Sequence, residues 1–246
     1  MTSPDSQVGP SPAQQVAWRG VIPAFIATMA SMLPSFLIAG FAVQIRADIG
    51  LSLSGLGILI GVFFGSAALV SPAMGRFAES TGWANALRVA AVLTGASLAG
   101  IGWLATSTVS LAFFYVIGGV GSSLAQIASN LAVARCVDVR KQGLVFGLRH
   151  AAVPAAATLA GLAVPTIALT VGWRWGFRGA VAFAAIAAVT TPAREEPYVI
   201  NPSQERSQGG PRATATPFRL LILLALAVGL GTGGGDTVGA FVVSYA

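Results

Sequence analysis

Long stretches without any charged side chain alternate along the chain with short charged segments. The first stretch covers residues 21–45 and contains Pro34, and the second covers residues 49–75. A helix needs about 20 mainly apolar residues to cross the hydrocarbon core of a bilayer. Each stretch therefore predicts one membrane-spanning helix. Pro34 predicts a kink in the first helix, and the second helix is expected to occupy roughly the last twenty residues of its stretch.

The next uncharged stretch, residues 89–134, is about twice as long as one bilayer crossing, and Thr106, Ser107 and Thr108 lie near its middle. It predicts a tight hairpin of two helices. A fifth helix is predicted at residues 151–171, after a basic segment at residues 135–150. A sixth and shorter helix is predicted at residues 175–193, if Arg178 extends its charged end toward the membrane surface.

Residues 1–17 and 194–217 are polar and contain no long apolar stretch. We expect a disordered cytosolic tail and a cytosolic linker, respectively. The last stretch, residues 218–246, predicts a seventh helix. Membrane-spanning strands would alternate apolar and polar residues over about ten positions, which this chain does not do. The predicted fold class is therefore an all-α membrane protein, with six transmembrane helices at residues 18–193 and a seventh after the linker.

The composition agrees with a chain that lies in a lipid bilayer. Hydrophobic residues make up 55% of the chain, charged residues make up 9%, and the mean hydropathy is +0.78. A water-soluble domain could not cover that much apolar surface. The net charge of +6 does not indicate nucleic-acid binding, because the 14 Lys and Arg residues are scattered between apolar stretches and do not form a basic face.

The positions of the basic residues predict an orientation. With a cytoplasmic N-terminus, all of the 14 Lys and Arg residues except Arg46, Arg174 and Arg178 fall on the cytoplasmic side. Loops rich in Lys and Arg stay in the cytoplasm. We therefore expect a multi-pass protein of the plasma membrane, the inner membrane of the cell, with its N-terminus in the cytoplasm.

Glycines recur at every fourth position on one face of the second predicted helix, at Gly57, Gly61 and Gly65. This spacing lets two helix backbones approach closely in a membrane. The alternative is the general abundance of glycine, of which the chain has 30.

A glycine-bounded segment joins the second and third predicted helices. Its residues are Gly75, Arg76, Glu79 and Gly82, and Arg88 follows. This arrangement resembles the signature of the major facilitator superfamily, which has a glycine, three residues, an acid, a base, one residue, a glycine and further bases. Ser80 occupies the place of the first base. By this resemblance the segment is a conformational latch; the alternative is an ordinary solvated turn.

The resemblance also implies a fold and a function. The fold is a six-helix bundle made of two inverted three-helix repeats, and the function is secondary transport of a small molecule by alternating access. Carriers of the superfamily have two such halves, so we expect the chain to be truncated after its seventh helix, with the missing C-terminal half or a second copy as partner and an ion as coupling partner. The alternative function is a membrane interaction protein that derives from such a carrier and no longer transports.

Polar side chains inside apolar helices are the candidates for a substrate cavity. Gln126 and Asn130 are four residues apart and share one helix face, where their amides could hold a substrate or bond a neighbouring helix. An acid inside a membrane helix, such as Asp236, is costly and so is a functional candidate. The full set is Ser35, Gln44, Gln126, Asn130, Thr158 and Asp236. The three basic residues of the outer side favour an anionic substrate.

Two expectations concern chemistry that the chain lacks. Many proton-driven drug exporters of the superfamily carry an arginine early in the fourth helix, four residues before a glycine. With Gly119 as that glycine, Tyr115 takes the arginine's place, and we do not expect proton antiport by that route. Phosphate-binding loops, metal-ligand clusters and nucleophile motifs do not occur, and Cys136 is the one cysteine. We therefore expect no enzyme activity, no cofactor and no metal.

Overall fold

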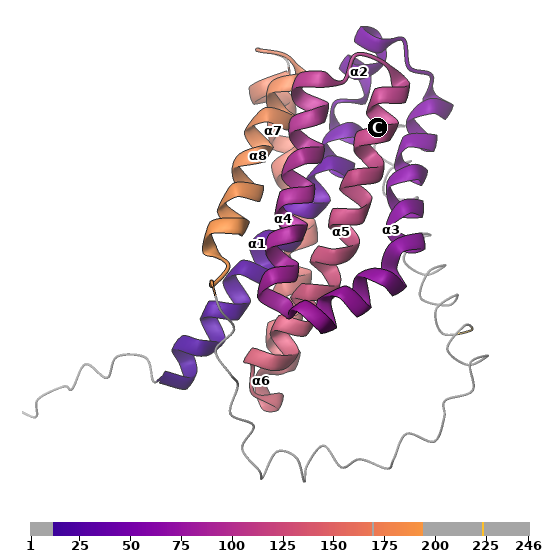
Figure 1. Ribbon diagram of the computed structural model, residues 1–246. Coiled ribbons are helices and arrows are strands. Elements are labelled where there is room, and N and C mark those ends of the chain that lie inside the picture. Colours follow the sequence, from indigo (N-terminus) through magenta and orange to yellow (C-terminus); the bar gives the residue numbers. More distant parts are fainter. Residues whose placement is uncertain (1–11, 169, 194–222, 224–246) are drawn as a thin grey trace, which may run out of the picture. The chain divides into compact units, whose positions relative to one another are not determined.

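A computed structural model describes residues 12–168, 170–193 and 223 (Figure 1). The chain divides into two compact units, residues 1–198 and 199–246, and all the elements that follow belong to the first. They are α1 (Pro12–Gly40), α2 (Ala42–Ile49), α3 (Leu53–Thr81), α4 (Trp83–Ala99), the π-helical turn η1 (Gly100–Leu104), α5 (Thr108–Cys136), α6 (Val139–His150), α7 (Ala152–Ala163), the π-helical turn η2 (Val164–Ala168) and α8 (Trp173–Thr190). The predicted all-α class is confirmed over these residues.

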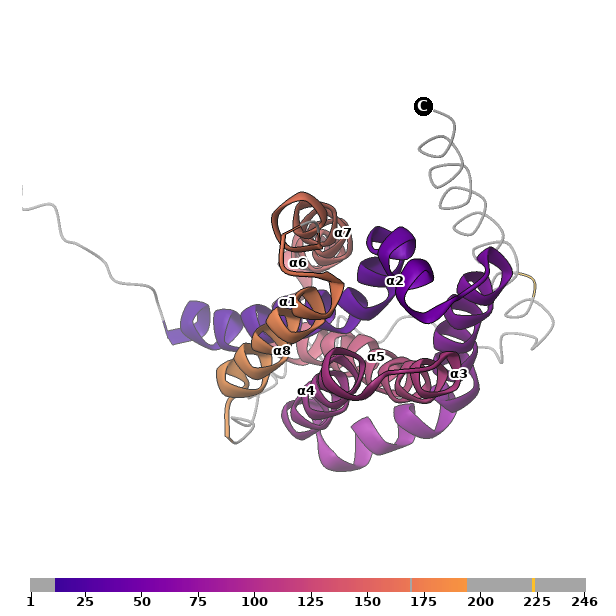
Figure 2. The same ribbon diagram turned by 90° about the horizontal axis from the view of Figure 1, so that it is seen from above.

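Helix α1 lies inside the bundle and contacts α4, α5, α7 and α8 (Figure 2). Helix α3 lies at the edge and packs mainly on α5 (Figure 1). The largest buried side chains lie where these helices meet, among them Phe41, Phe63, Tyr115 and Phe177. The core is therefore built around the first helix of the chain, from partners that come much later in the sequence.

Five helical segments are long and apolar enough to cross a membrane: Gly20–Gly40, Leu53–Thr81, Trp83–Leu104, Thr108–Cys136 and Arg140–Ile167. Helix α8 is not among these five. It has 18 residues, which correspond to about 27 Å at 1.5 Å per residue. The sixth predicted helix is thus present, and its crossing of the membrane stays a prediction.

The first helix begins and ends at other residues than those predicted from the sequence. Helix α1 begins at Pro12, inside the predicted disordered tail, and proline is favoured at a first helical position because its missing N–H has no partner there anyway. Helix α1 continues through Pro34 and ends at Gly40, and the short α2 follows. Gln44 therefore lies on α2 and not on the first long helix.

The second predicted helix is longer than expected. Helix α3 continues past Gly75 to Thr81, so the candidate latch residues Gly75, Arg76 and Glu79 lie on a helix and not in a turn. The turn itself is Gly82, whose φ of 84° and ψ of 160° are strained for a residue with a side chain. Charged residues are tolerated at this helix end because it extends beyond the apolar stretch.

The fifth helix was predicted to begin at residue 151, after the basic segment, but this segment is itself helical from Val139 onward. Helix α6 begins there, with the Asp138 carboxylate accepting a hydrogen bond from the Arg140 backbone N–H. The candidate span Arg140–Ile167 contains Arg149, which we had placed among the cytoplasmic loop charges. A charge can lie inside a membrane helix when it faces the bundle interior, so the last charged residue does not mark the start of the span.

The hairpin of the third and fourth predicted helices is confirmed. Ser107 and Ser110 form a capping box that satisfies backbone N–H groups at the start of α5. The close helix contacts use glycines of α5, however. A Cβ atom on Gly119 would overlap the Phe63 carbonyl group of α3. Nothing in the described residues lies within 4 Å of a Cβ atom added at Gly57, Gly61 or Gly65, so the predicted glycine contact is absent from this part of the chain.

Candidate functional site

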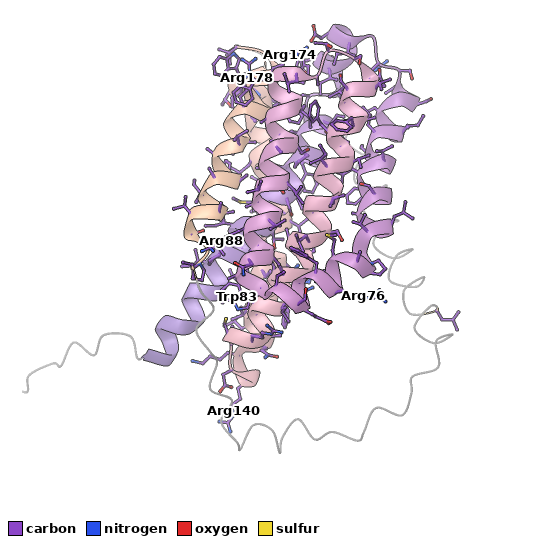
Figure 3. All side chains as sticks on the ribbon, viewed as in Figure 1. Arg76, Trp83, Arg88, Arg140, Arg174 and Arg178 are labelled. Atoms are coloured by element: carbon purple, nitrogen blue, oxygen red, sulfur yellow. The ribbon has the colours of Figure 1, made fainter. Side chains whose placement is uncertain are left out.

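Charged residues lie toward the two ends of the bundle. Arg174 and Arg178 lie at one end, and Arg76, Arg88 and Arg140 lie toward the other (Figure 3). This separation agrees with the predicted division of basic residues between two sides of a membrane. Which side faces the cytoplasm stays a prediction.

Arg88 connects α4 to the end of α8, at the end of the bundle that carries the candidate latch. Its Nη1 donates to the Ala193 carbonyl at 3.2 Å, and its Nη2 donates to the Thr191 carbonyl at 3.2 Å. A cation at a helix C-terminus satisfies carbonyl groups that have no partner within the helix. Arg88 therefore caps the end of α8, a contact that its position in the sequence motif did not reveal.

The acid of the candidate latch lies apart from Arg88. Glu79 is exposed on the last turns of α3 and makes no ion pair within the described ranges. Arg76 is exposed as well, and a Cβ atom on Gly75 would meet no atom of the described residues within 4 Å. These residues thus leave this face of α3 open, whereas Gly82 provides the turn as expected.

At the opposite end, Arg174 joins three segments. Its Nη2 lies 3.1 Å from Oδ2 of Asp48, and its Nη1 donates to the Ala105 carbonyl at 2.7 Å. The indole N–H of Trp173 donates to the same Asp48 oxygen at 3.2 Å. Asp48 belongs to α2, Ala105 follows η1, and the other two residues begin α8. The ion pair and the hydrogen bond to Ala105 therefore fix the beginning of α8 to α2 and to the chain that follows η1.

Arg178 is also bound within the bundle. Its Nε donates to the Gly102 carbonyl at 2.9 Å, and its guanidinium lies 5.3 Å from the centre of the Trp103 ring and 4.9 Å from that of Trp175. Such cation–π contacts hold a guanidinium between indoles. A surface hollow of about 330 Å³ is lined by Asp48, Val171, Gly172, Trp173, Arg174, Trp175 and Arg178. Arg174 and Arg178 thus serve the packing of α8.

A buried arginine and a half-buried glutamine join α6 to α5. Arg149 of α6 is only 3% exposed. Its Nη2 donates to the side-chain oxygen of Gln126 on α5, and lies 3.4 Å from the Gln126 backbone carbonyl oxygen. The Arg149 Nε has no hydrogen-bond partner among the described residues. Gln126 was a predicted cavity residue, and Arg149 is the residue that the sequence reasoning missed.

A signal for Arg149 was present in the sequence. Ala152, Ala156 and Ala160 are buried on α7 and follow Arg149 at helical spacing. Positions three and four residues apart share one helix face. Continuing this apolar stripe back by one turn would have placed Arg149 on the interior face.

The other amide of the predicted pair, Asn130, is exposed. The bond to a neighbouring helix is made by Ser129, whose hydroxyl donates to the Ala24 carbonyl at 3.1 Å and accepts from Thr28 at 3.1 Å. The structure therefore does not bring Gln126 and Asn130 together around one partner. Helix α5 is held to α1 by hydroxyl groups and to α6 by Gln126.

The remaining cavity candidates are dispersed. Ser35 is buried and donates to the Met32 carbonyl of its own helix at 2.9 Å, and Thr158 is exposed and donates to the Pro154 carbonyl at 2.9 Å. The side-chain oxygen of Gln44 is buried without a partner in the described part of the chain. Asp236 lies outside the described residues, as do the predicted linker and all of the predicted seventh helix except Leu223.

Comparisons with known proteins bear on the fold. The sequence profile of the Major Facilitator Superfamily matches residues 24–245. No curated protein matches the sequence. Among solved structures, the proton:xylose symporter XylE bound to 6-bromo-6-deoxy-D-glucose is similar with a TM-score of 0.67 at 18% identity, over 79% of this chain and 47% of that one.

Two further solved structures agree. The inward-open xylose transporter XylE from E. coli has a TM-score of 0.64 at 17% identity, over 87% of this chain and 56% of that one. A D-xylose-proton symporter has a TM-score of 0.62 at 19% identity, over 78% of this chain and 52% of that one. The chain spans about half the length of these proteins, and at this identity the likeness concerns the fold alone. The family match covers most of the sequence, and with the helical bundle it shows that this chain belongs to the major facilitator superfamily.

Proposed function

We propose that this protein is a secondary active transporter that moves a small molecule across the plasma membrane by alternating access. The observation that carries the proposal is the family match over residues 24–245. The structural neighbours are described as proton:xylose symporters, which supports a small-molecule substrate and a coupling ion. Xylose itself is not proposed as the substrate, because the similarity is limited to the fold.

The described residues supply one helical bundle of the pathway. Alternating access moves one bundle against another around a site near the middle of the membrane. The second bundle would come from a partner half or from a second copy of the chain. The open face of α3, with Gly57, Gly61 and Gly65, leaves room for close approach of another helix.

The segment around Gly82 would act at the cytoplasmic end of this movement. Glu79 is exposed there, and Arg88 holds the end of α8. As a conformational latch, Glu79 would form an ion pair with the second bundle in one of the two transport states and lose it in the other. The N-terminus would lie on this side, in the cytoplasm.

The test is gradient-driven uptake by the purified full chain in liposomes. A pH gradient and then a sodium gradient are imposed, and the uptake of radiolabelled xylose, benzoate and phosphate is followed as neutral, carboxylate and inorganic-anion probes. Accumulation that an ionophore abolishes would support transport. The chain in these liposomes would carry Cys136→Ser and Asn130→Cys. Position 130, which is exposed, is then the one cysteine that a maleimide can label.

The alternative function, a membrane interaction protein that does not transport, gives a different result in this experiment. None of the three probes would accumulate, and the cysteine at position 130 would react with a membrane-impermeant maleimide from one side only under every gradient. An alternating-access carrier instead exposes its pathway to both sides in turn. This pair of results would contradict the transport proposal.

A further inference from the structure

The Arg149 guanidinium is buried, and no opposite charge pairs with it among the described residues. Arginine keeps its proton in proteins and offers five N–H donors. Only Nη2 is engaged, with two neutral oxygens of Gln126, and the buried Nε has no acceptor among the described residues. A buried charge in a membrane protein is normally paired or lines a functional cavity. This arginine is therefore short of one negative charge.

The described part of the bundle does not supply that charge. Over the five candidate membrane spans, Glu79 is the single carboxylate, and it lies exposed on the last turns of α3. Asp48 is bound to Arg174 at the other end of the bundle. Gln126 can accept hydrogen bonds but carries no charge. The compensating anion would therefore have to come from outside the described residues.

The depth of the pair in the membrane matches a substrate site. Along α6, Arg149 lies about 14 Å from Arg140 at 1.5 Å per residue, and along α5, Gln126 lies about 15 Å from Cys136. Arg140 and Cys136 end their respective candidate spans. The two spans have 28 and 29 residues, so Arg149 and Gln126 lie about 6–7 Å from the midpoints of their spans at 1.5 Å per residue. Secondary transporters hold their substrates inside the membrane-spanning bundle, and both groups lie well inside these spans.

The pair also offers suitable donors to an incoming anion. The Gln126 oxygen faces Arg149, and its amide NH₂ group has no bond within the part of the chain that the structure describes. Gln126 is only half-buried, whereas Arg149 is buried behind it. An anion that displaces the Gln126 oxygen from Nη2 would gain the guanidinium and keep the amide NH₂ as a second donor.

We propose that Arg149 and Gln126 bind the carboxylate of a monoanionic organic substrate inside the membrane-spanning bundle. A planar guanidinium pairs with a carboxylate through two parallel hydrogen bonds. The pair has one positive charge, which balances one carboxylate and leaves a phosphate dianion undercompensated. This inference rests on the proposed transport function for its biological meaning, and its test measures binding separately from transport.

The test is thermal unfolding of the detergent-solubilised full chain with acetate, lactate or benzoate, beside xylose, phosphate and the neutral analogue benzamide. A ligand that binds only the folded protein raises its unfolding temperature with concentration. At least one carboxylate should raise this temperature, and benzamide and xylose should not. Arg149→Gln should weaken the apparent carboxylate affinity by about tenfold or more, since it removes a charge-assisted bidentate contact.

Three variants separate binding from a purely structural role. Arg140→Gln removes an exposed arginine from the same helix and should leave the carboxylate effect unchanged. Arg149→Lys should keep the charge but lose the bidentate geometry, giving intermediate affinity. Gln126→Ala should weaken the effect less than Arg149→Gln. Without ligand, Arg149→Gln should unfold at the same or a higher temperature, because it removes an unpaired buried charge.

The inference is wrong if no carboxylate stabilises the protein, or if Arg149→Gln responds to carboxylates as the unaltered chain does. A lower unfolding temperature of Arg149→Gln without any carboxylate effect would assign Arg149 a packing role instead. Uptake of a neutral probe without carboxylate binding would leave the transport function standing and reject this site. Carboxylate binding without uptake of any probe would support the site and reject transport.

Discussion

The Tyr115 hydroxyl donates a hydrogen bond to the Pro34 carbonyl, with 2.7 Å between the two oxygens. Tyr115 belongs to α5 and Pro34 to α1, and both are buried. The Tyr115 ring also packs edge to face on Phe63, with ring centres 6.0 Å apart. Tyr115 therefore ties three helices together, α5, α1 and α3.

Tyr115→Phe should lower the free energy of unfolding by about 1 kcal/mol, because hydrogen bonds between membrane helices contribute on this scale. Tyr115→Ala should lower it by about 3–5 kcal/mol, since it also removes a buried ring. Reversible unfolding in mixed detergent micelles measures both values. Equal effects of the two variants would contradict the separate contribution of the ring.

Arg88→Gln should loosen the end of α8. The substitution removes the positive charge from the helix C-terminus and the two hydrogen bonds to Thr191 and Ala193, an effect of about 1–2 kcal/mol. Hydrogen exchange of the backbone amides near residue 190 should become faster. Arg76→Gln is the matched control, because Arg76 is exposed, and it should leave this exchange unchanged.

Arg174→Ala should destabilise the protein more than Asp48→Asn does. The ion pair is partly exposed, with 27% and 49% of the two side chains accessible, so the charge of Asp48 contributes less than about 1 kcal/mol. Arg174 additionally bonds the Ala105 carbonyl and stacks 4.7 Å from the Trp173 ring centre. Thermal unfolding of both variants gives the order, and a larger loss in Asp48→Asn would refute it.

Glu79→Gln should change which side of the membrane the pathway faces. If Glu79 is part of a latch, loss of its charge should alter the maleimide labelling of single cysteines placed along α1, while the amount of protein in the membrane stays the same. Asn85→Asp adds an exposed acid one helix further on and serves as the control. Unchanged labelling in Glu79→Gln would contradict the latch and indicate that the segment is a solvated helix end.

Reporter fusions should place Gly82, Asp138 and residue 205 in the cytoplasm and Ser107 outside. The prediction follows from the distribution of Lys and Arg residues between the two sides. Alkaline phosphatase is active only after export, and green fluorescent protein fluoresces only in the cytoplasm, so the two reporters should give opposite signals at each position. An active phosphatase at residue 82 or 138 would reverse the predicted orientation.

The helices could be predicted because apolar stretches of membrane length have few alternatives in lipid. The errors arose where a charge was taken as the end of a helix. Glu79 lies within α3, and Arg140 lies within the candidate span that also contains Arg149. Hydropathy along the chain reports how many apolar residues follow one another, but it does not report which face of a helix a charge occupies.

The pairing within the site could not be predicted, because it depends on contacts between distant helices. Gln126 was selected for its polarity, whereas its partner depends on how α5 and α6 pack. Asn130 shared the expected face and is nevertheless exposed. Its neighbour Ser129 makes the bond to α1 instead, since a one-residue change of position rotates a side chain by about 100° around the helix.

The central position of α1 also sets an order of assembly during synthesis. Thr28 leaves the ribosome early, yet its hydrogen-bond partner Ser129 lies 101 residues later. At about 5–20 residues per second, that partner is made about 5–20 s afterwards. Until then, the buried hydroxyls of α1 have no bundle around them. Helix α1 can therefore complete its contacts only after α4, α5, α7 and α8 have been made.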